Sequence, residues 1–514
     1  MNKTNWILVG FLGLKFFLQY ILLSPAYDLQ RDEYLHLDLG KHLAWGYASV
    51  PPVTSWISFL IDLLGNSIFW VKFFPALFGA LTILFVWKAI EELKGSLFAL
   101  VLGATCVLFS SLLRLNTLYQ PNSLDVLCWT ACYFFIIKYF NSEKAKWLYI
   151  ASIIFAFGFL NKYNIVFLLA GIIPAILLTQ QRNIFLKREF YISILLVVLL
   201  ILPNLIWQYQ NDFPVIYHLK ELAETQLINV SRRGFLKSQL SFFFGSLIVI
   251  FAGIVSFLFY EPFKKHRPFF WAFIFTLIIF IYLKAKDYYA IGLYPIYISF
   301  GAVFLGHVLK VGWKKYLQPV LILIPVLIFI PMYQFAFPNK SPEYIIAHSE
   351  IYKKTGSLRW EDGKDHDIPQ DYADMLSWKE LAYKVDSLYK QLPDKSHTLI
   401  LCDNYGQAGA INFYTNQSIQ AVSFNADYVN WIDIKKTYSN LIRVKDYKKQ
   451  DEELNKTRPY FENSFLADSI TNKYAREYGT KIYVFIHSKV DINQRIKMEI
   501  KNTKVKFRKP TNEN

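Results

Sequence analysis

Long apolar runs constrain this chain more than any other feature. Eleven stretches reach or approach the length of roughly 20 residues that an α-helix needs to cross a bilayer. They cover residues 6–23, 67–90, 97–113, 124–140, 147–160, 163–178, 190–206, 238–260, 268–284, 288–309 and 316–334. Hydrophobic residues make up 54% of the 514, a fraction too high for a soluble protein of this size. The pattern predicts a polytopic α-helical membrane protein with about eleven spans.

Short basic loops between the runs indicate the orientation. Residues 1–334 contain 27 Lys and Arg against 15 Asp and Glu, and most of the cations fall in alternate short loops. This is the charge pattern of cytoplasmic loops, so we expect no nucleic-acid partner. The alternation holds only if 147–160 and 163–178 are two spans with a break at Asn161-Lys162. It predicts a multi-pass protein of the bacterial inner membrane with a cytoplasmic N-terminus and an external C-terminal domain.

A change of composition after residue 337 predicts a domain boundary. Residues 1–337 are expected to form the transmembrane domain, and 338–514 a soluble external domain, because no later run is long enough to span. Two expected strands and two expected helices favour a small α/β fold there; they are 398–402, 481–487, 378–392 and 404–411. The basic segment 497–509 predicts a solvated or disordered tail.

An acidic loop, residues 24–66, follows the first span directly. It contains Asp28, Asp32, Glu33 and Asp38 at a membrane surface, where charge is costly unless it is used. The amphipathic segments in this loop predict two helices at the membrane interface; they are 34–46 and 51–64. A solvated acidic loop with a helix-capping Asp is the alternative interpretation.

This loop resembles the first external loop of GT-C glycosyltransferases of the protein O-mannosyltransferase and lipid A aminoarabinose transferase type. In that family an Asp-Glu pair follows the first transmembrane helix and a Pro-Pro turn comes later, as Asp32-Glu33 and Pro51-Pro52 do here. The resemblance implies that Asp32, the first acid, occupies the catalytic position. It extends over most of residues 1–310.

One departure from the family lies just before the Pro-Pro turn. The aminoarabinose transferases carry Glu-Lys there and the mannosyltransferases a His, whereas this chain has Ser49-Val50. The resemblance therefore implies a different donor or acceptor from theirs.

A sugar transferase at a membrane needs a base for the acceptor hydroxyl. When the donor is a polyprenyl-phosphate sugar, the leaving phosphate has a second pKa near 6, so it needs no acid to protonate it. One carboxylate then suffices, whereas glycoside hydrolysis usually needs two. Asp32 fits the general base and Glu33 a group that orients the loop or the acceptor. Tyr34, Pro51 and Pro52 are expected to line the substrate pocket.

Asp125 is the second acid of interest, at the external start of the run 124–140. The family commonly has an Asp near the start of this helix, which implies a catalytic role. A carboxylate is also favourable near any helix N-terminus, and that interpretation stays open.

Four cations are candidates for binding the donor phosphate. Lys286 precedes Tyr288-Tyr289 and resembles the family's Lys-x-Tyr-Tyr pattern, and both tyrosines are expected in the substrate pocket. Lys162 matches a Leu-x-Lys-Tyr element of the same enzymes. The paired guanidiniums of Arg232 and Arg233 suit phosphate geometry. For each cation the alternative is an interfacial anchor that snorkels.

Two motifs in the soluble domain resemble a bacterial branch of family 39 glycosyltransferases. They are Asp371-Tyr372-Ala373-Asp374-Met375 with Trp378, and Asn404-Tyr405-Gly406-Gln407-Ala408.

These features predict an inverting membrane glycosyltransferase for hexosyl or pentosyl groups. The expected partners are a polyprenyl-phosphate sugar, such as an undecaprenyl-phosphate sugar, the membrane lipids, and a lipid, glycan or protein acceptor. No cofactor is expected, and no metal-ligand spacing is present. A transporter or flippase of lipid-linked sugars would favour internal repeats and charged, broken helices at mid-membrane. In a cell-envelope polymer-binding assembly protein, the acidic loop would be dispensable.

Overall fold

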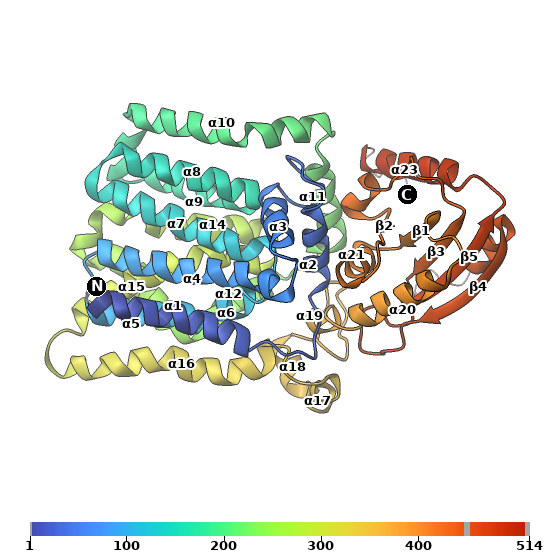
Figure 1. Cartoon of the computed structure of the whole chain (residues 1–514). Helices are drawn as coiled ribbons and strands as arrows, with labels where there is room; N and C mark the ends of the chain where they lie inside the picture. Colours follow the sequence, from blue (N-terminus) through green and yellow to red (C-terminus); the bar gives the residue numbers. More distant parts are fainter. Residues whose placement is uncertain (1–2, 447–452, 509–514) are drawn as a thin grey trace. The chain divides into compact units, whose positions relative to one another are not determined.

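The computed structural model describes residues 3–446 and 453–508, and its contacts divide the chain into two compact units (Figure 1). The helical unit comprises Met1–Leu23, Ser67–Ile206 and Ala223–Asn339. The mixed unit comprises Ser24–Asn66, Trp207–Leu222 and Lys340–Asn514. The acidic loop therefore belongs to the same compact unit as the residues after 339.

Long apolar helices build the helical unit. They are α1 (Lys3–Ile21), α4 (Ile68–Glu92), α5 (Leu97–Leu108), α6 (Ser111–Leu115), α7 (Pro121–Ser142), α8 (Ala145–Asn161), α9 (Val166–Leu177), α10 (Arg188–Gln210), α12 (Arg232–Phe242), α13 (Leu247–Phe259), α14 (Pro268–Tyr282), α15 (Tyr294–Val308) and α16 (Leu317–Ala336). Each predicted apolar run falls on one or two of these helices, and α8 and α9 are separate, with Lys162 at the break. The polytopic helical fold is confirmed.

The length and apolar character of the helices limit the number of membrane spans. Within residues 3–446 and 453–508, six helices are long and apolar enough to cross a membrane, or up to eight if each of two bent pairs is one span. The bent pairs are residues 163–177 with 180–186, at 108°, and 232–242 with 244–259, at 67°. Helices α5, α8 and α14 are apolar but shorter. The count of eleven stays a prediction.

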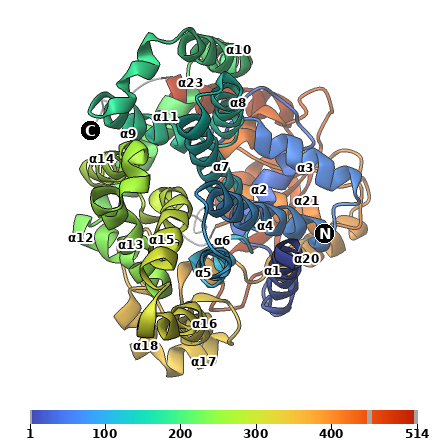
Figure 2. The same ribbon diagram turned by 90° about the vertical axis from the view of Figure 1, so that its left-hand side faces the viewer.

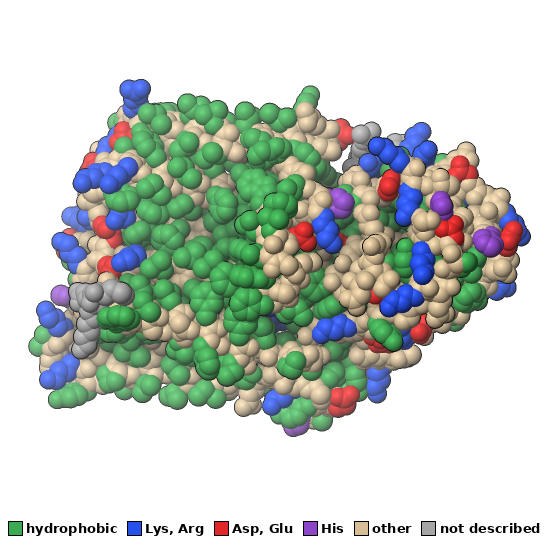
Figure 3. Space-filling view, in the orientation of Figure 1, with side chains coloured by type: hydrophobic (Ala, Val, Ile, Leu, Met, Phe, Trp, Pro, Cys, Tyr) green, Lys and Arg blue, Asp and Glu red, His purple; other side chains and the backbone are tan. Residues whose placement is uncertain are grey.

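The surface of the helical unit is that of a protein in contact with lipid. Helices α4, α7 and α8 pack side by side (Figure 2). Hydrophobic side chains cover the flank of the unit, and charged ones gather at the end where α1 begins (Figure 3). Leu195 and Leu199 of α10 are more than half exposed, whereas Lys88, in the last turns of α4, and Lys94, just after that helix, are exposed cations. An apolar flank with charged ends is the arrangement that a bilayer requires.

The mixed unit contains a small sheet and its covering helices. Its elements are α2 (Arg31–Leu39), α3 (Val53–Leu63), α11 (Pro214–Thr225), α17 (Pro342–Ala347), α18 (Ser349–Thr355), α19 (Gln370–Ala373), α20 (Trp378–Gln391), β1 (Thr398–Cys402), α21 (Tyr405–Tyr414), β2 (Ala421–Ser423), β3 (Asn440–Lys445), α22 (Glu453–Thr457), β4 (Phe461–Ser469), β5 (Lys481–Ser488) and α23 (Ile492–Arg508). The strand order is β2-β1-β3-β5-β4. Strands β1, β2 and β3 are parallel, and β5 is antiparallel to β3 and β4.

The expected small α/β fold after residue 337 is found, with one correction. Leu399, Leu441 and Phe485 pack on one face of the sheet against Ile492 and Ile496 of α23. Of the two alternatives for the segment 497–509, disorder is wrong for residues 497–508, because they continue α23. The solvated alternative agrees with the exposure of Lys497 and Lys501. Ile492 and Ile496 of that helix cover the sheet, while Lys497 and Lys501 are exposed away from this apolar stripe. Lys509 lies outside the described residues.

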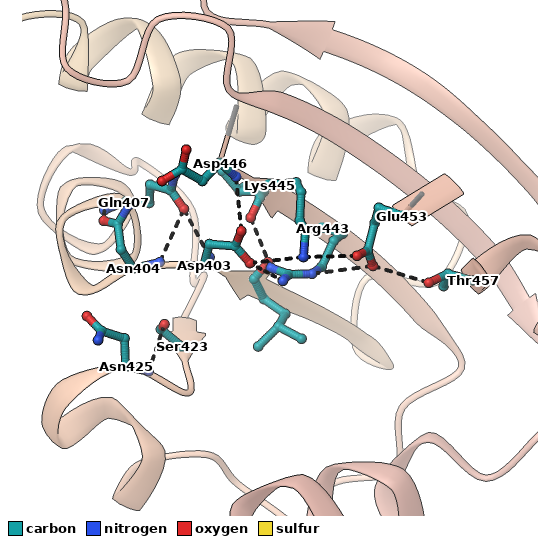
Figure 4. A network of polar contacts seen from close by, with 12 residues as sticks. Asp403, Asn404, Gln407, Ser423, Asn425, Arg443, Lys445, Asp446, Glu453 and Thr457 are labelled. Atoms are coloured by element: carbon teal, nitrogen blue, oxygen red, sulfur yellow. Dashed lines mark hydrogen bonds and ion pairs between the residues drawn. The ribbon is translucent and has the colours of Figure 1, made fainter. Parts of the chain in front are cut away.

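An ion-pair network joins the carboxyl ends of β1 and β3 (Figure 4). Asp403 accepts a hydrogen bond from the guanidinium of Arg443 and lies 3.5 Å from Lys445 Nζ. Glu453 lies 3.1 Å from the same Nζ, and the backbone N–H of Asp446 donates to Asp403 at 3.1 Å. Both carboxylates are thus paired with cations, and we interpret the network as structural, because it links β1 to β3.

The two predicted interfacial segments differ in exposure. Helix α2 is buried from Glu33 to Leu39 inside the mixed unit, whereas α3 exposes Phe59, Leu60 and Leu63. Since α3 ends only a few residues before α4, its exposed apolar face lies close in the chain to a membrane span. The interfacial position of both segments stays a prediction.

Candidate active site

Asp32 and Glu33 lie in the first turn of α2. Gln30 is the N-cap: its side-chain oxygen accepts the Asp32 N–H at 2.8 Å, and Glu33 Oε2 accepts the Gln30 N–H at 2.7 Å. This capping box orients the start of the helix, and acids in the first turn are favourable toward the helix dipole. Glu33 is fully buried, whereas Asp32 is only partly buried. Of the pair, Asp32 is therefore the acid whose side chain solvent can reach.

Two further acids of the loop, Asp28 and Asp38, stabilise the mixed unit. Asp28 Oδ2 accepts the backbone N–H groups of Trp378 and Lys379, at 3.0 and 3.2 Å, and thereby caps α20. Asp38 Oδ2 accepts hydrogen bonds from the Tyr428 hydroxyl and from the Asn412 amide, both at 2.7 Å. The helix-capping role that the alternative interpretation gave to an Asp of this loop belongs to Asp28.

Asp32 has a partner from the region after residue 337. The Tyr405 hydroxyl donates to Asp32 Oδ1 at 2.7 Å, and the guanidinium carbon of Arg31 lies 4.2 Å from the centre of the Tyr405 ring. Burial raises the pKa of the Tyr405 phenol above its usual range, and the charge of Asp32 adds to that effect. The phenol therefore stays protonated and donates a hydrogen bond to the carboxylate.

The predicted pocket residues of the loop are buried in the mixed unit. Tyr34 is fully buried, with its ring edge-on to Trp378 at 5.6 Å and its hydroxyl 3.2 Å from that of Tyr414. Pro51 and Pro52 are also buried, and Pro52 is the N-cap residue of α3. All three pack inside the unit and hold α2 and α3 in place.

A second cluster, in the helical unit, contains Asp125, Lys162 and Tyr289. Asp125 is buried in α7, and its Oδ2 accepts a hydrogen bond from Asn164 Nδ2 at 2.9 Å. The same Nδ2 donates to the Tyr289 carbonyl at 3.0 Å, and Lys162 Nζ donates to Asn122 Oδ1 at 2.6 Å. Burial lowers the pKa of Lys162 to about 8, and the negative charge of Asp125 opposes that shift. Asp125 and Lys162 thus belong to one buried polar network.

Lys162 and Lys286 both lie near the aromatic ring of Tyr288. Lys162 Nζ lies 4.4 Å from the Tyr289 ring centre and 5.1 Å from that of Tyr288. Lys286 Nζ lies 6.0 Å from the Tyr288 ring. A cation over an aromatic face is attracted by the ring quadrupole. Four of the residues predicted from separate motifs, two lysines and two tyrosines, are therefore brought together.

Arg232 and Arg233 begin α12 and are both exposed. Arg232 Nε donates to the Ile281 carbonyl at 3.2 Å, near the end of α14. The structure thus places Arg232 beside the segment that leads to Lys286.

Asn122 and Asn164 were missed as site residues by the sequence reasoning. Asn164 joins Asp125 to the Tyr289 carbonyl, and Asn122 holds Lys162. Both lie close in the chain to residues that a motif identifies, and this proximity could have indicated them. An Asn at a helix end, however, is usually a helix cap.

No metal site emerges within the described ranges, 3–446 and 453–508: no three His, Cys, Asp or Glu residues lie together as possible ligands. Whether the protein needs a metal or a cofactor stays a prediction.

The family model for dolichyl-phosphate-mannose-protein mannosyltransferase matches residues 49–207. The lipid A galacturonosyltransferase RgtD of Rhizobium johnstonii is 25% identical over 240 residues, which is 46% of this chain. The match spans 50% of that relative's own length.

Solved structures share the fold over nearly the whole chain. ArnT from Cupriavidus metallidurans bound to undecaprenyl phosphate superimposes with a TM-score of 0.60 at 12% identity, over 94% of this chain and 98% of ArnT. In the apo state of ArnT the TM-score is 0.63 at 11% identity, over the same shares of both chains. The chain therefore has the GT-C fold, in a multi-pass membrane protein with a small sheet in its C-terminal part.

Proposed function

We propose that this protein is an integral membrane glycosyltransferase that takes its sugar from a polyprenyl-phosphate donor. The meeting of Lys162 and Lys286 at the Tyr288 ring carries the proposal. Two ammonium groups suit one phosphate, which gains from charge-assisted hydrogen bonds, and the aromatic rings beside them suit a sugar face. That the ArnT structure holds undecaprenyl phosphate supports the same class of donor.

The chemistry follows from one carboxylate and an anionic leaving group. The acceptor hydroxyl oxygen attacks the anomeric carbon as the bond between that carbon and the phosphate oxygen breaks. The electron pair of the broken bond leaves with the polyprenyl phosphate, and Asp32 takes the hydroxyl proton. Attack from the face opposite the phosphate inverts the anomeric configuration. The lysines stabilise the charge that grows on the phosphate, so the donor needs no second acid.

The basic alternate loops support a bacterial inner-membrane location with the N-terminus in the cytoplasm. The mixed unit, with Asp32, is then external. A lipid, glycan or protein hydroxyl is the acceptor, and the name of the matched relative, a lipid A galacturonosyltransferase, supports the lipid. The sugar is a hexosyl or pentosyl group.

Purified protein incubated with a panel of radiolabelled polyprenyl-phosphate sugars and bacterial membrane extract tests this proposal. We expect label from at least one donor to move into the lipid, glycan or protein fraction, with free polyprenyl phosphate released in equal amount. Heat-denatured protein is the control. Failure of every donor to transfer label, in protein that is shown to be folded, would contradict the proposal.

A further inference from the structure

The acidic loop packs against a glycine-containing helix of the domain after residue 337. Helices α2 and α21 are in contact, and Gly406 and Gly409 lie where they meet. A Cβ at Gly406 would come within 2.7 Å of Arg31 Cγ, and one at Gly409 within 2.8 Å of Tyr34 Cβ. Any larger residue would push the helices apart. The two glycines thus let α21 approach the helix that carries Asp32.

Backbone hydrogen bonds hold the chain before Asp32. The Asp28 N–H donates to the Met375 carbonyl at 2.8 Å, and the Arg31 N–H donates to the Asp374 carbonyl at 3.0 Å. Asp374 is held in turn, because its carboxylate pairs with Arg476 at 3.0 Å. The loop therefore cannot shift without breaking contacts to residues 374–378.

The motif around Tyr405 completes this arrangement. Its hydroxyl is the group that donates to Asp32 Oδ1, and Arg31 covers its ring. The capping box of Asn404 and Gln407 fixes the first turn of α21, where Tyr405 lies. The motifs of the soluble domain, which the proposed function leaves without a role, thus converge on the candidate base.

We propose that Tyr405 and Arg31 are positioning residues that orient the carboxylate of Asp32, so that the domain after residue 337 contributes to the active site through Tyr405. This inference rests on the proposed function, because it takes Asp32 as the base. A carboxylate that one donor holds has fewer orientations, and a base must reach its proton in one geometry. The phenol oxygen, and not merely the packing of the domain, is then required for full turnover.

Tyr405→Phe removes only that oxygen and keeps the ring against Arg31. We expect turnover to fall roughly 10- to 100-fold while the KM for the donor stays within about twofold, as misplacement of a reacting group typically produces. Thermal unfolding checks that the variant is folded. Arg31→Lys keeps the charge but loses the planar stacking on Tyr405, and should lower turnover with the same unchanged KM.

The matched control is Tyr428→Phe. Tyr428 also donates to an acid of α2, Asp38, at 2.7 Å. The Tyr428→Phe variant should lower the unfolding temperature by as much as Tyr405→Phe does, yet its turnover should stay within about twofold of the parent. Equal losses of turnover in the two variants would mean that both act through stability, which would overturn the inference.

A double-mutant cycle with Asp32→Asn separates this inference from the function that it rests on. If Tyr405 acts through Asp32, adding Tyr405→Phe to Asp32→Asn should change the residual turnover by less than about twofold. If the double variant instead lost turnover by the product of the two single losses, Tyr405 would not act through Asp32 and the positioning role would be overturned. If Tyr405→Phe kept the turnover of the parent while Asp32→Asn lost it, the inference would be overturned and the proposed function would stand. An active Asp32→Asn would overturn both.

Discussion

Asp32→Asn should lower turnover by roughly 10²–10⁴-fold, the contribution of a general base, while expression and donor affinity stay near those of the parent. Asn keeps the shape of the side chain and an oxygen that can accept a hydrogen bond from the Tyr405 hydroxyl. It cannot take the proton of the acceptor hydroxyl. Initial rates of sugar transfer in purified protein measure the effect.

Neighbouring acids are the controls for Asp32. Glu33→Gln should lower turnover less, because Glu33 serves the capping box and the amide oxygen of the substituted Gln can still accept a hydrogen bond from the Gln30 N–H. Asp38→Asn changes an acid of the same helix that is bound to a Tyr hydroxyl, and it should leave turnover of the folded fraction largely intact. Asp125→Asn shows whether a second acid shares the role. Transfer at nearly the parent rate by Asp32→Asn would remove the loop from the catalytic centre.

Lys286→Ala should weaken donor binding by roughly tenfold to a hundredfold, because a charge-assisted hydrogen bond to phosphate contributes about 1.5–3 kcal/mol. Folding should change little, since the side chain is only partly buried and packs on Tyr288. Donor affinity, measured by titration of labelled polyprenyl-phosphate sugar, reports the loss.

Lys284→Ala is the matched control for the phosphate prediction. Lys284 lies two residues earlier in the same segment and is exposed, so its loss tests net charge near the membrane without the contact to Tyr288. Donor affinity and turnover of Lys286→Ala that both stay within about twofold of the parent would contradict the phosphate assignment.

The helices could be predicted from the sequence because membrane spans have an unmistakable apolar length. The sheet was harder. Strand β1 is a continuous apolar run and was predicted over its full range, and β5 nearly so. Strand β3 was missed because Arg443 and Lys445, which form the ion-pair network, interrupt its apolar pattern. Strand β4 was missed because it is a largely exposed edge strand, for which alternation of apolar and polar residues is weak.

The candidate site could be predicted residue by residue but not as an arrangement. Asp32, Lys162 and Lys286 each belong to a short motif, so each could be found singly. The contact of Tyr405 with Asp32 joins residues 373 positions apart, and no local pattern contains such a separation. Tyr34 follows the Asp-Glu pair directly in the sequence, and the helical period turns its side chain into the core of the mixed unit.

A glycosyltransferase breaks the bond between the sugar and the polyprenyl phosphate, whereas a flippase moves the intact lipid. Proteoliposomes containing the protein and a donor labelled with ³H in the sugar and ³²P in the phosphate distinguish these two activities directly. When acceptor membrane extract is added, we expect ³H to pass to the acceptor while ³²P remains with the polyprenyl phosphate. If both labels stayed on one molecule under every condition while that molecule changed leaflet, the protein would be a transporter and not the proposed glycosyltransferase.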